Sequence, residues 1–122
     1  MNRLGALERK VMDVLWDSMG HPLSGRQVAD QLPDRAYTTV LTILERLRRK
    51  KLVERRSADR IHVFNATASR ESYMADLMLE PLGTALDRDA VLVRFAKTVS
   101  PQEAKILREA LEDNAKPKKG RR

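Results

Sequence analysis

The hydrophobic positions near the start of the chain recur at the spacing of α-helices. Residues 4–19 carry apolar side chains three or four positions apart, and Gly20 follows as a C-cap residue. Ser24 and Gln27 then have the spacing of a capping box, which predicts that a second, short helix begins there. The chain is therefore expected to open with two helices.

A third helix is predicted over residues 35–50, with Asp34 as its N-cap. After it the period changes, because residues 52–56 and 61–65 are short β-prone runs on either side of a polar turn at 57–60. Three helices followed by a hairpin is the order of elements in a winged helix-turn-helix. Periodicity alone also fits other small α+β domains.

The rest of the chain is predicted to form three further helices. Ser69 can cap the first, which Pro81 kinks or ends, and Asp87 can cap the second. Ser100 and Glu103 have capping-box spacing ahead of the third, with a proline in the first helical position. We therefore expect a mainly α fold with a small β-hairpin.

These last helices are amphipathic and short, and they follow a complete small domain, so they have too little surface against which to bury their apolar faces. Homodimerisation through those faces is the simplest remedy. The predicted organisation is a winged-helix DNA-binding domain at 1–68, a helical dimerisation module at 69–115 and a basic, disordered tail at 116–122. The predicted dimerisation residues are Tyr73, Leu77, Met78, Leu82, Val91, Leu92, Phe95, Ile106, Leu107 and Leu111.

Composition narrows the class of protein. The 122 residues are 42% hydrophobic but only 4% aromatic, which predicts a small domain with an aliphatic core. The absence of cysteine excludes disulfides, thiolate metal sites and thiol redox sensing. No apolar run is long enough to cross a membrane and no signal peptide is recognisable, so we expect a cytoplasmic protein without membrane insertion.

The net charge of +7 is unevenly distributed along the chain. Residues 35–66 carry 9 basic and 3 acidic side chains, a net charge of +6, whereas residues 67–115 carry 6 and 9, a net charge of −3. A basic segment of this kind indicates a nucleic-acid partner. The basic tail is compatible with either a solubilising end or an arm that grasps DNA.

The predicted third helix combines this charge with hydroxyl groups. At helical spacing, threonines and arginines share a strip away from the apolar face. Threonine offers a hydroxyl and a methyl group to base edges in the major groove, and arginine binds guanine or phosphate. Any one threonine is more simply an exposed residue, and any one hairpin arginine a solvated charge, but the whole pattern favours DNA. The predicted DNA-binding residues are Tyr37, Thr38, Thr39, Thr42, Arg46 and Arg49, with Arg55, Arg56 and Arg60 as contacts from the wing.

Three motifs together resemble one known family. E-x-x-V-M-x-V-L-W lies in the first predicted helix, Y-T-T-V-x-T-x-L-x-R-L lies in the third, and V-F-x-A leaves the hairpin. They resemble the BlaI/MecI family of β-lactamase repressors, which are winged-helix regulators of antibiotic-resistance genes. The resemblance covers residues 4–80 well and the later helices in outline.

The resemblance implies a homodimer that represses transcription from a palindromic operator of TAC/GTA type. Carried over by position, the base-contacting sites fall on Thr38 and Thr39, with Arg46 as a further DNA contact. It also implies induction by a membrane-bound β-lactam sensor protease, and the matching bond is Arg94–Phe95, where several relatives have Asn before Phe. Copper-responsive relatives carry C-terminal cysteines, which this chain lacks.

Other functions fit the residues less well. The chain has no cysteine nucleophile or Gly-rich phosphate loop, and His21 and His62 lack metal-ligand spacing, so we expect no enzyme, no metal and no cofactor. One alternative is a winged-helix repressor that responds to a small molecule held between the domain and the dimer interface. The other is an architectural basic protein that binds nucleic acid without reading its sequence.

Overall fold

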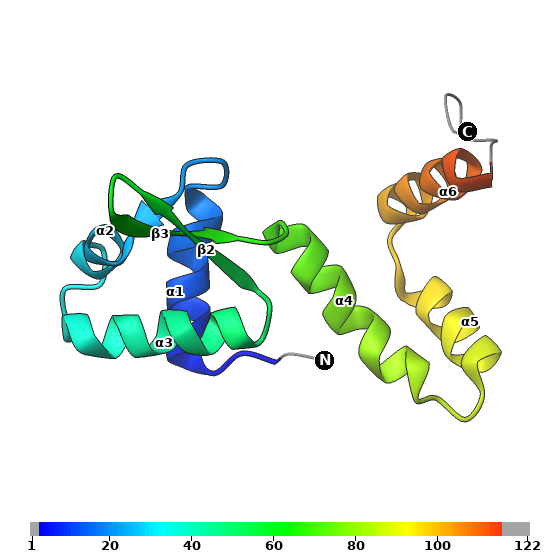
Figure 1. The fold of residues 1–122 in the computed structure, drawn as a ribbon. Coiled ribbons are helices and arrows are strands. Elements are labelled where there is room, and N and C mark those ends of the chain that lie inside the picture. The colour runs from blue at the N-terminus through cyan, green and yellow to red at the C-terminus, as the bar shows by residue number, and fades with distance from the viewer. Residues whose placement is uncertain (1–2, 116–122) are drawn as a thin grey trace. The chain divides into compact units, whose positions relative to one another are not determined.

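The computed structural model describes residues 3–115, so the tail predicted at 116–122 lies outside the described residues. These residues form two compact units, the first ending at Glu80 and the second beginning at Pro81 (Figure 1). The predicted fold class, mainly helical with a small antiparallel sheet, is confirmed. The elements are α1 (Ala6–Asp17), β1 (Leu23–Ser24), α2 (Gly25–Asp30), α3 (Tyr37–Arg49), β2 (Val53–Ala58), β3 (Ile61–Ala66), α4 (Arg70–Gly83), α5 (Arg88–Thr98) and α6 (Pro101–Ala115).

The starts of α2 and α3 follow from hydrogen bonds between residues close in the sequence. Ser24 and Gln27 form the predicted capping box, with the Ser24 Oγ accepting from the Gln27 N–H at 3.1 Å. The N-cap of α3 is Ala36, so the predicted capping role of Asp34 is wrong. The reason is a turn before the helix, in which the Arg35 N–H donates to the Leu32 carbonyl at 3.0 Å. The third helix therefore begins two residues later than predicted.

The sheet has three antiparallel strands in the order β1-β3-β2. Strand β1 is only two residues long, too short to leave an alternating pattern in the sequence, and pairs Leu23 with Phe64. In the hairpin, Ala58 pairs with Ile61, so the turn contains only Asp59 and Arg60 and is shorter than the predicted 57–60. Both turn residues have positive φ, 52° and 67°, as a two-residue hairpin turn whose twist matches the strands requires.

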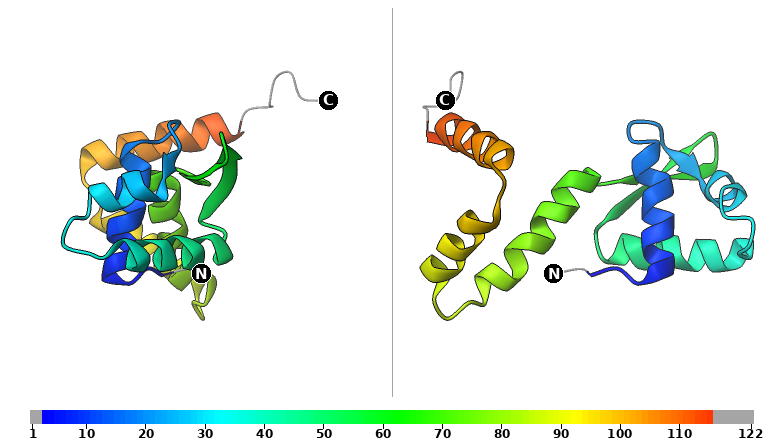
Figure 2. Two further views of the ribbon diagram at one scale, coloured as in Figure 1. Left: turned by 60° about the vertical axis from the view of Figure 1, so that its left-hand side comes forward. Right: turned by 180° about the vertical axis from the view of Figure 1, so that it is seen from behind.

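One hydrophobic core joins the helices and sheet of the first unit. Figures 1 and 2 show α1 crossing α3, with the β2–β3 hairpin beside both. The core is aliphatic except for three aromatic side chains, in agreement with the composition. Its members are Val11, Met12, Val14, Leu15, Trp16, Val28, Ala29, Val40, Ile43, Leu44, Leu47, Val53, Phe64, Ala66 and Tyr73.

The beginning of α4 is packed onto α1. The Trp16 Nε1–H donates to the Ala68 carbonyl at 3.0 Å, and the rings of Trp16 and Tyr73 lie 5.4 Å apart. Arg70 extends over the Trp16 ring and donates to Asp17 at 2.9 Å. These contacts join the beginning of α4 to the first unit, which ends at Glu80. Tyr73, predicted as a dimerisation residue, is 6% exposed and lies in this core.

The helices of the second unit begin where the sequence predicted. The Asp87 Oδ1 accepts from the Ala90 N–H at 3.0 Å, and Ser100 and Glu103 exchange both bonds of a capping box. Pro81 lies inside the last turn of α4, which ends at Gly83. Neither α5 nor α6 contains a buried residue. Within residues 3–115, none of the helices combines the length and the apolar character needed to cross a membrane.

Candidate nucleic-acid interface

Helix α3 presents a polar strip from a firmly anchored backbone. Val40, Ile43, Leu44 and Leu47 bury one face of the helix in the core of the first unit. The threonines and arginines predicted to contact DNA lie on the other side, where helical spacing places them together. Since the buried face fixes the helix, these side chains project from a rigid element. The exposed strip consists of Thr38, Thr39, Thr42, Arg46 and Arg49.

The Thr42 hydroxyl is oriented along the helix. Its Oγ1 donates to the Thr38 carbonyl at 3.0 Å, a bond typical of threonine in a helix interior. With its proton used in this way, the hydroxyl presents acceptor lone pairs outward, and its methyl group is fixed. This arrangement suits a base edge that offers a donor or a thymine methyl group.

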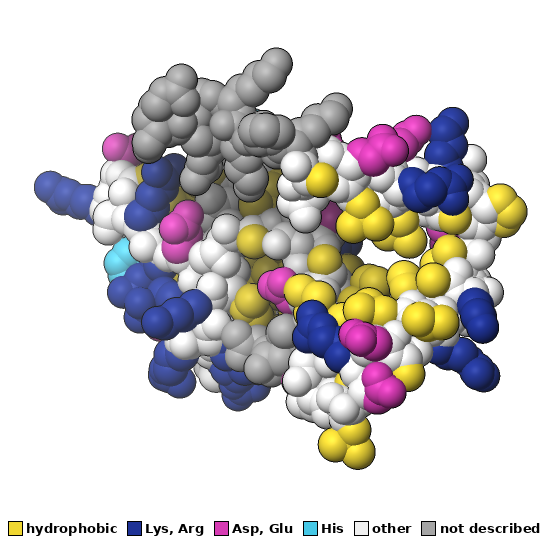
Figure 3. Space-filling view, turned by 90° about the vertical axis from the view of Figure 1, so that its right-hand side faces the viewer, with side chains coloured by type: hydrophobic (Ala, Val, Ile, Leu, Met, Phe, Trp, Pro, Cys, Tyr) yellow, Lys and Arg dark blue, Asp and Glu magenta, His cyan; other side chains and the backbone are white. Residues whose placement is uncertain are grey.

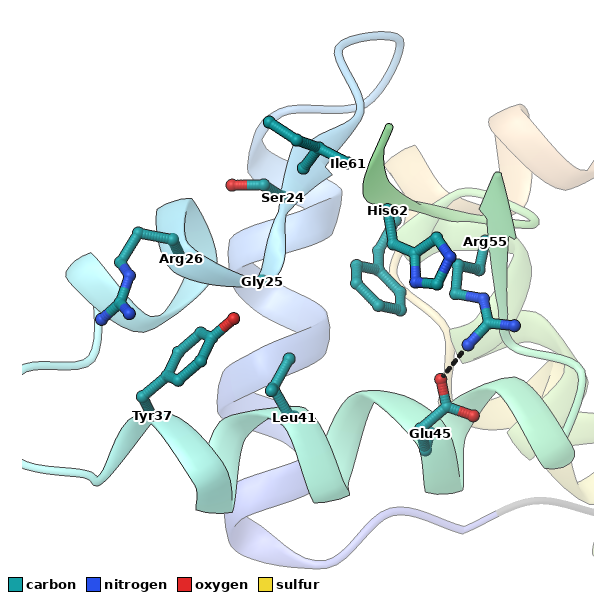
Figure 4. Close-up of a pocket in the computed structure, with 10 residues that line it drawn as sticks. Ser24, Gly25, Arg26, Tyr37, Leu41, Glu45, Arg55, Ile61 and His62 are labelled. Atoms are coloured by element: carbon teal, nitrogen blue, oxygen red, sulfur yellow. Dashed lines mark hydrogen bonds and ion pairs between the residues drawn. The ribbon is translucent and has the colours of Figure 1, made fainter. Parts of the chain in front are cut away.

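Arg26 lies beside the N-terminal end of α3. It is not one of the DNA-binding residues predicted from the sequence. Its guanidinium lies 4.0 Å from the centre of the Tyr37 ring, so the half-buried tyrosine serves as a platform for an exposed cation (Figure 4). Arg26 lies within the capping box of α2, between Ser24 and Gln27. Nothing in the sequence pattern indicates that stacking, because it joins two helices across a turn.

A groove of about 640 Å³ separates α3 from the hairpin. Leu41 and Phe64 contribute apolar surface to its lining. His62 lies at its β-sheet side (Figure 4). Arg26 and Tyr37 line one end of the groove and Arg55 the other. The groove therefore has an arginine at each end, and Glu45 also lines it.

Arg55 is engaged in an ion pair at the base of the hairpin. Its Nη1 donates to the Glu45 Oε2 at 2.9 Å, and Arg48 donates to the other carboxylate oxygen at 3.0 and 3.1 Å. The hydrogen bond from Arg48 holds the pKa of Glu45 below its ordinary value; burial opposes this, and the charges of Arg48 and Arg55 reinforce it. Arg55, predicted as a wing contact, thus links the hairpin to α3 inside the first unit.

The other two hairpin arginines are exposed, and one of them is at the tip. Arg60 has a φ of 67°, a conformation that favours Gly and costs an ordinary residue free energy. Arg56 lies on β2, with its side chain exposed. Within the described part of the chain, neither Arg56 nor Arg60 forms any of the ion pairs that the structure contains.

The basic C-terminal end of α3 is partly used for folding. Lys50 donates to both oxygens of Glu8, at 2.9 and 3.1 Å, and Glu8 is only 6% exposed. Burial by itself raises the pKa of Glu8, but bonds from the Gly5 N–H and Lys50, with the charges of Lys50 and Arg46, lower it overall. Lys50 therefore ties α3 to α1.

The predicted dimerisation residues fall into two groups. Leu77 packs against the core of the first unit, as Tyr73 does, and Leu82 is half-buried. The other residues present hydrophobic surface to solvent, visible as yellow areas in Figure 3. These exposed residues are Met78, Val91, Leu92, Phe95, Ile106, Leu107 and Leu111.

The bond predicted for regulatory cleavage lies inside a helix. Arg94 and Phe95 are both exposed, and α5 continues for three residues beyond Phe95. A helical backbone does not fit the extended conformation in which proteases bind a substrate, so cleavage of the predicted bond would require local unwinding of α5. Residues 3–115 contain no cluster of three His, Asp or Glu side chains that could hold a metal ion.

Comparison with known proteins identifies a family whose model this chain matches. Residues 4–113 match the model of the penicillinase repressor family. The chain is 44% identical over 117 residues to proteins from two Mycobacterium tuberculosis strains, CDC 1551 / Oshkosh and H37Rv, each named transcriptional regulator BlaI. Each alignment covers 91% of this chain and 84% of the relative.

Solved structures of other regulators share the fold at low sequence identity. The S. aureus MepR–DNA complex gives a TM-score of 0.52 at 21% identity, covering 80% of this chain and 82% of that protein. A MarR family protein from Bacillus stearothermophilus gives 0.52 at 13% identity, covering 92% and 73%. At these identities the likeness concerns the fold, which is that of a winged-helix regulator.

Proposed function

Because this chain belongs to the penicillinase repressor family, and is thus a transcriptional repressor and not an enzyme, we propose that it binds a palindromic operator of TAC/GTA type as a homodimer. It acts on DNA in the cytoplasm, and its targets are β-lactamase or other antibiotic-response genes. The resemblance of its motifs to the BlaI/MecI family supports these details. The operator is double-stranded, and each subunit reads one half-site.

The exposed strip of α3 is the observation that carries this proposal. Thr38 and Thr39 lie at the N-terminal end of the helix, the end that a recognition helix points at base edges. Arg46 and Arg49 follow about two and three turns later, where they meet a base or a phosphate. The apolar face keeps all four side chains in one register.

The hairpin supplies contacts to the DNA backbone. Arg60 occupies a turn position that favours glycine, and a positively charged side chain kept there at a cost in backbone energy supports a functional role. Arg56 extends the same positive surface along β2. Arg26, held over Tyr37 at the other end of the groove, is a third backbone contact.

Dimerisation uses the exposed apolar residues of α5 and α6. Val91, Leu92 and Phe95 form a stripe on α5, and Ile106, Leu107 and Leu111 form another on α6. Contiguous apolar stripes on capped helices indicate a protein partner, and a second copy of the chain satisfies both subunits equally. The dimer then sets the spacing between the two copies of α3.

Derepression follows from loss of this dimer, by dissociation or by proteolysis. The proposed cleavage at Arg94–Phe95 by a membrane-bound β-lactam sensor protease cuts through the apolar stripe of α5. Because the bond is helical, the rate of cleavage depends on local unwinding of α5.

Fluorescence anisotropy tests the proposal on two duplexes of about 30 base pairs, long enough for two half-sites. One carries a TAC/GTA dyad and the other a scrambled sequence, and each is titrated at low and near-physiological salt. We expect a preference for the dyad that survives the higher salt. Equal affinities that both collapse with salt would instead indicate an architectural protein that binds backbone alone.

Two variants test whether the preference for the dyad duplex depends on α3. Thr39→Val keeps the shape of the side chain and removes its hydroxyl, and we expect it to reduce the preference for the dyad by about tenfold, the effect of losing one base contact. Thr84→Val makes the same exchange at an exposed position beyond the end of α4 and should leave both affinities unchanged.

A further inference from the structure

One carboxylate interrupts the positive face of α3. Glu45 precedes Arg46 and follows Thr42 by three residues, so it borders the exposed strip. It lines the groove beneath the hairpin, and it also lines a second hollow of about 310 Å³ that it shares with Arg46 and Arg49. Figure 4 shows its side chain reaching from α3 towards Arg55. A carboxylate at this place repels phosphate, so its presence on a DNA-binding face requires a reason.

Glu45 accepts hydrogen bonds from two positively charged side chains. Its Oε1 accepts two bonds from Arg48 and its Oε2 accepts one from Arg55, at distances between 2.9 and 3.1 Å. Its side chain is 32% exposed, as is that of Arg55, so solvent screens this pair only in part. Two guanidinium groups are thus held by one carboxylate.

We propose that Glu45 determines specificity by withholding Arg48 and Arg55 from phosphate, an inference that rests on the proposed function. Sequence-independent affinity grows with the number of phosphates that a protein neutralises. With these two cations held, the attraction comes from Arg26, Arg46, Arg49, Arg56 and Arg60, while base contacts from α3 are retained.

Release of the two arginines increases the affinity for scrambled DNA more than the affinity for the operator. On scrambled DNA the protein samples many registers, so a released cation finds a phosphate in some of them. On the operator, base contacts fix one register, and a cation gains only if a phosphate lies beside it there. The bond between Glu45 and Arg55 also holds the hairpin against α3, and its loss loosens the geometry of the specific complex.

Glu45→Gln in the full-length protein tests the inference, with salt titrations on the dyad and scrambled duplexes between roughly 50 and 200 mM salt. On scrambled DNA we expect about tenfold tighter binding at low salt, and a plot of log affinity against log salt that is steeper by about 1–2. The ratio of operator to scrambled affinity should fall by several-fold. An unchanged slope on scrambled DNA would overturn the inference.

Glu54→Gln is the matched control for charge. Glu54 is exposed on β2 beside Arg55 in sequence and forms none of the ion pairs within residues 3–115. Both variants change the net charge by the same amount, so a general charge effect would alter the two slopes equally. We expect Glu54→Gln to have the smaller effect, and equal effects would refute a specific role for Glu45.

A second pair of variants tests the same idea without touching Glu45. Arg55→Gln should leave the slope on scrambled DNA unchanged, because Arg55 is already held, whereas Arg56→Gln should make it shallower by about 1. An equal loss from both variants would show that Arg55 contacts phosphate in the native protein. These slopes are measured on scrambled DNA, so they remain informative even if the wild type shows no preference for the dyad, which is the outcome that rejects the proposed function.

Discussion

The two units of this chain have equally well-formed helices but very different interiors. Leu44 in the first unit is fully buried, whereas Leu111 in the second is 64% exposed. Both units contain capping boxes with complete hydrogen bonds. Capping and amphipathic spacing therefore suffice to form a helix, but burial requires a second surface. The first unit supplies that surface from its own chain, and we propose that the second obtains it from another copy.

This difference separates the two tasks of a repressor. The exposed strip lies on α3, whose apolar face is packed into a core. The geometry of the strip therefore does not depend on a partner. The apolar residues of α5 and α6 are available for association, which is reversible if the dimer is not too tight. We therefore expect that substitutions can alter the proposed DNA reading and the proposed dimerisation independently.

The largest effect is expected from breaking the proposed dimer. Phe95→Glu places a charge in the apolar stripe of α5, and loss of the dimer should lower operator affinity by about 10²–10⁴-fold, since two half-sites are no longer bound together. Sedimentation equilibrium should show a monomer, while the thermal unfolding of the first unit is unchanged.

Lys97→Glu is the control for this substitution. It introduces the same side chain two residues later, on the other side of α5. We expect a dimer with nearly native operator affinity. If Phe95→Glu also remained a dimer, the stripe on α5 would not be the interface.

Tyr73→Ala distinguishes the core from the interface. Because Tyr73 packs on Trp16, its truncation should reduce the free energy of unfolding of the first unit by about 3 kcal/mol, measured by urea denaturation. Met74→Ala, at the exposed neighbouring position, should change it by less than about 0.5 kcal/mol. A weaker dimer with unchanged stability in Tyr73→Ala would instead support the role that sequence alone predicted.

Acid should destabilise the first unit through Glu8. The pKa of Glu8 is lower in the folded state than in the unfolded state. The contribution of Glu8 to stability is therefore present above the unfolded-state pKa, and it is lost as the pH falls through the folded-state pKa. Glu8→Gln should therefore cost about 2 kcal/mol at pH 7, where Lys50 loses a charged partner. That difference should shrink below about pH 4.3, as wild-type Glu8 becomes protonated.

The second unit supplies the control for the pH experiment. Glu112→Gln removes an exposed carboxylate of α6. At each pH, the urea midpoint of the first unit should equal that of the wild type. A similar acid sensitivity in wild type and Glu8→Gln would assign the effect to other carboxylates.

The smallest effect is expected at the end of α3. Lys51 has a φ of 66° just after the helix, where glycine is preferred. Lys51→Gly should increase the free energy of unfolding by about 0.5–1 kcal/mol, as measured by urea denaturation. Lys10→Gly, in the interior of α1, should instead cost about 1 kcal/mol. A loss of stability in both variants would show that Lys51 makes a contact that outweighs its backbone strain.

Much of the helical framework was predictable because its signals are local. The capping boxes at Ser24 and Ser100 and the apolar spacing of α3 each depend on residues within one or two turns. Asp34 shows the limit of such signals, since a good capping residue is not used when a turn places the helix start further along.

The sequence by itself determined the order of the six helices and the hairpin, the basic segment and the side of α3 that carries threonine and arginine. Only the tertiary structure decided which apolar and charged residues were already engaged. Tyr73 joins the core, Arg55 binds Glu45 and Arg26 stacks on Tyr37. The physical reason is distance along the chain: these contacts join residues on different elements, and no periodicity within one element records them.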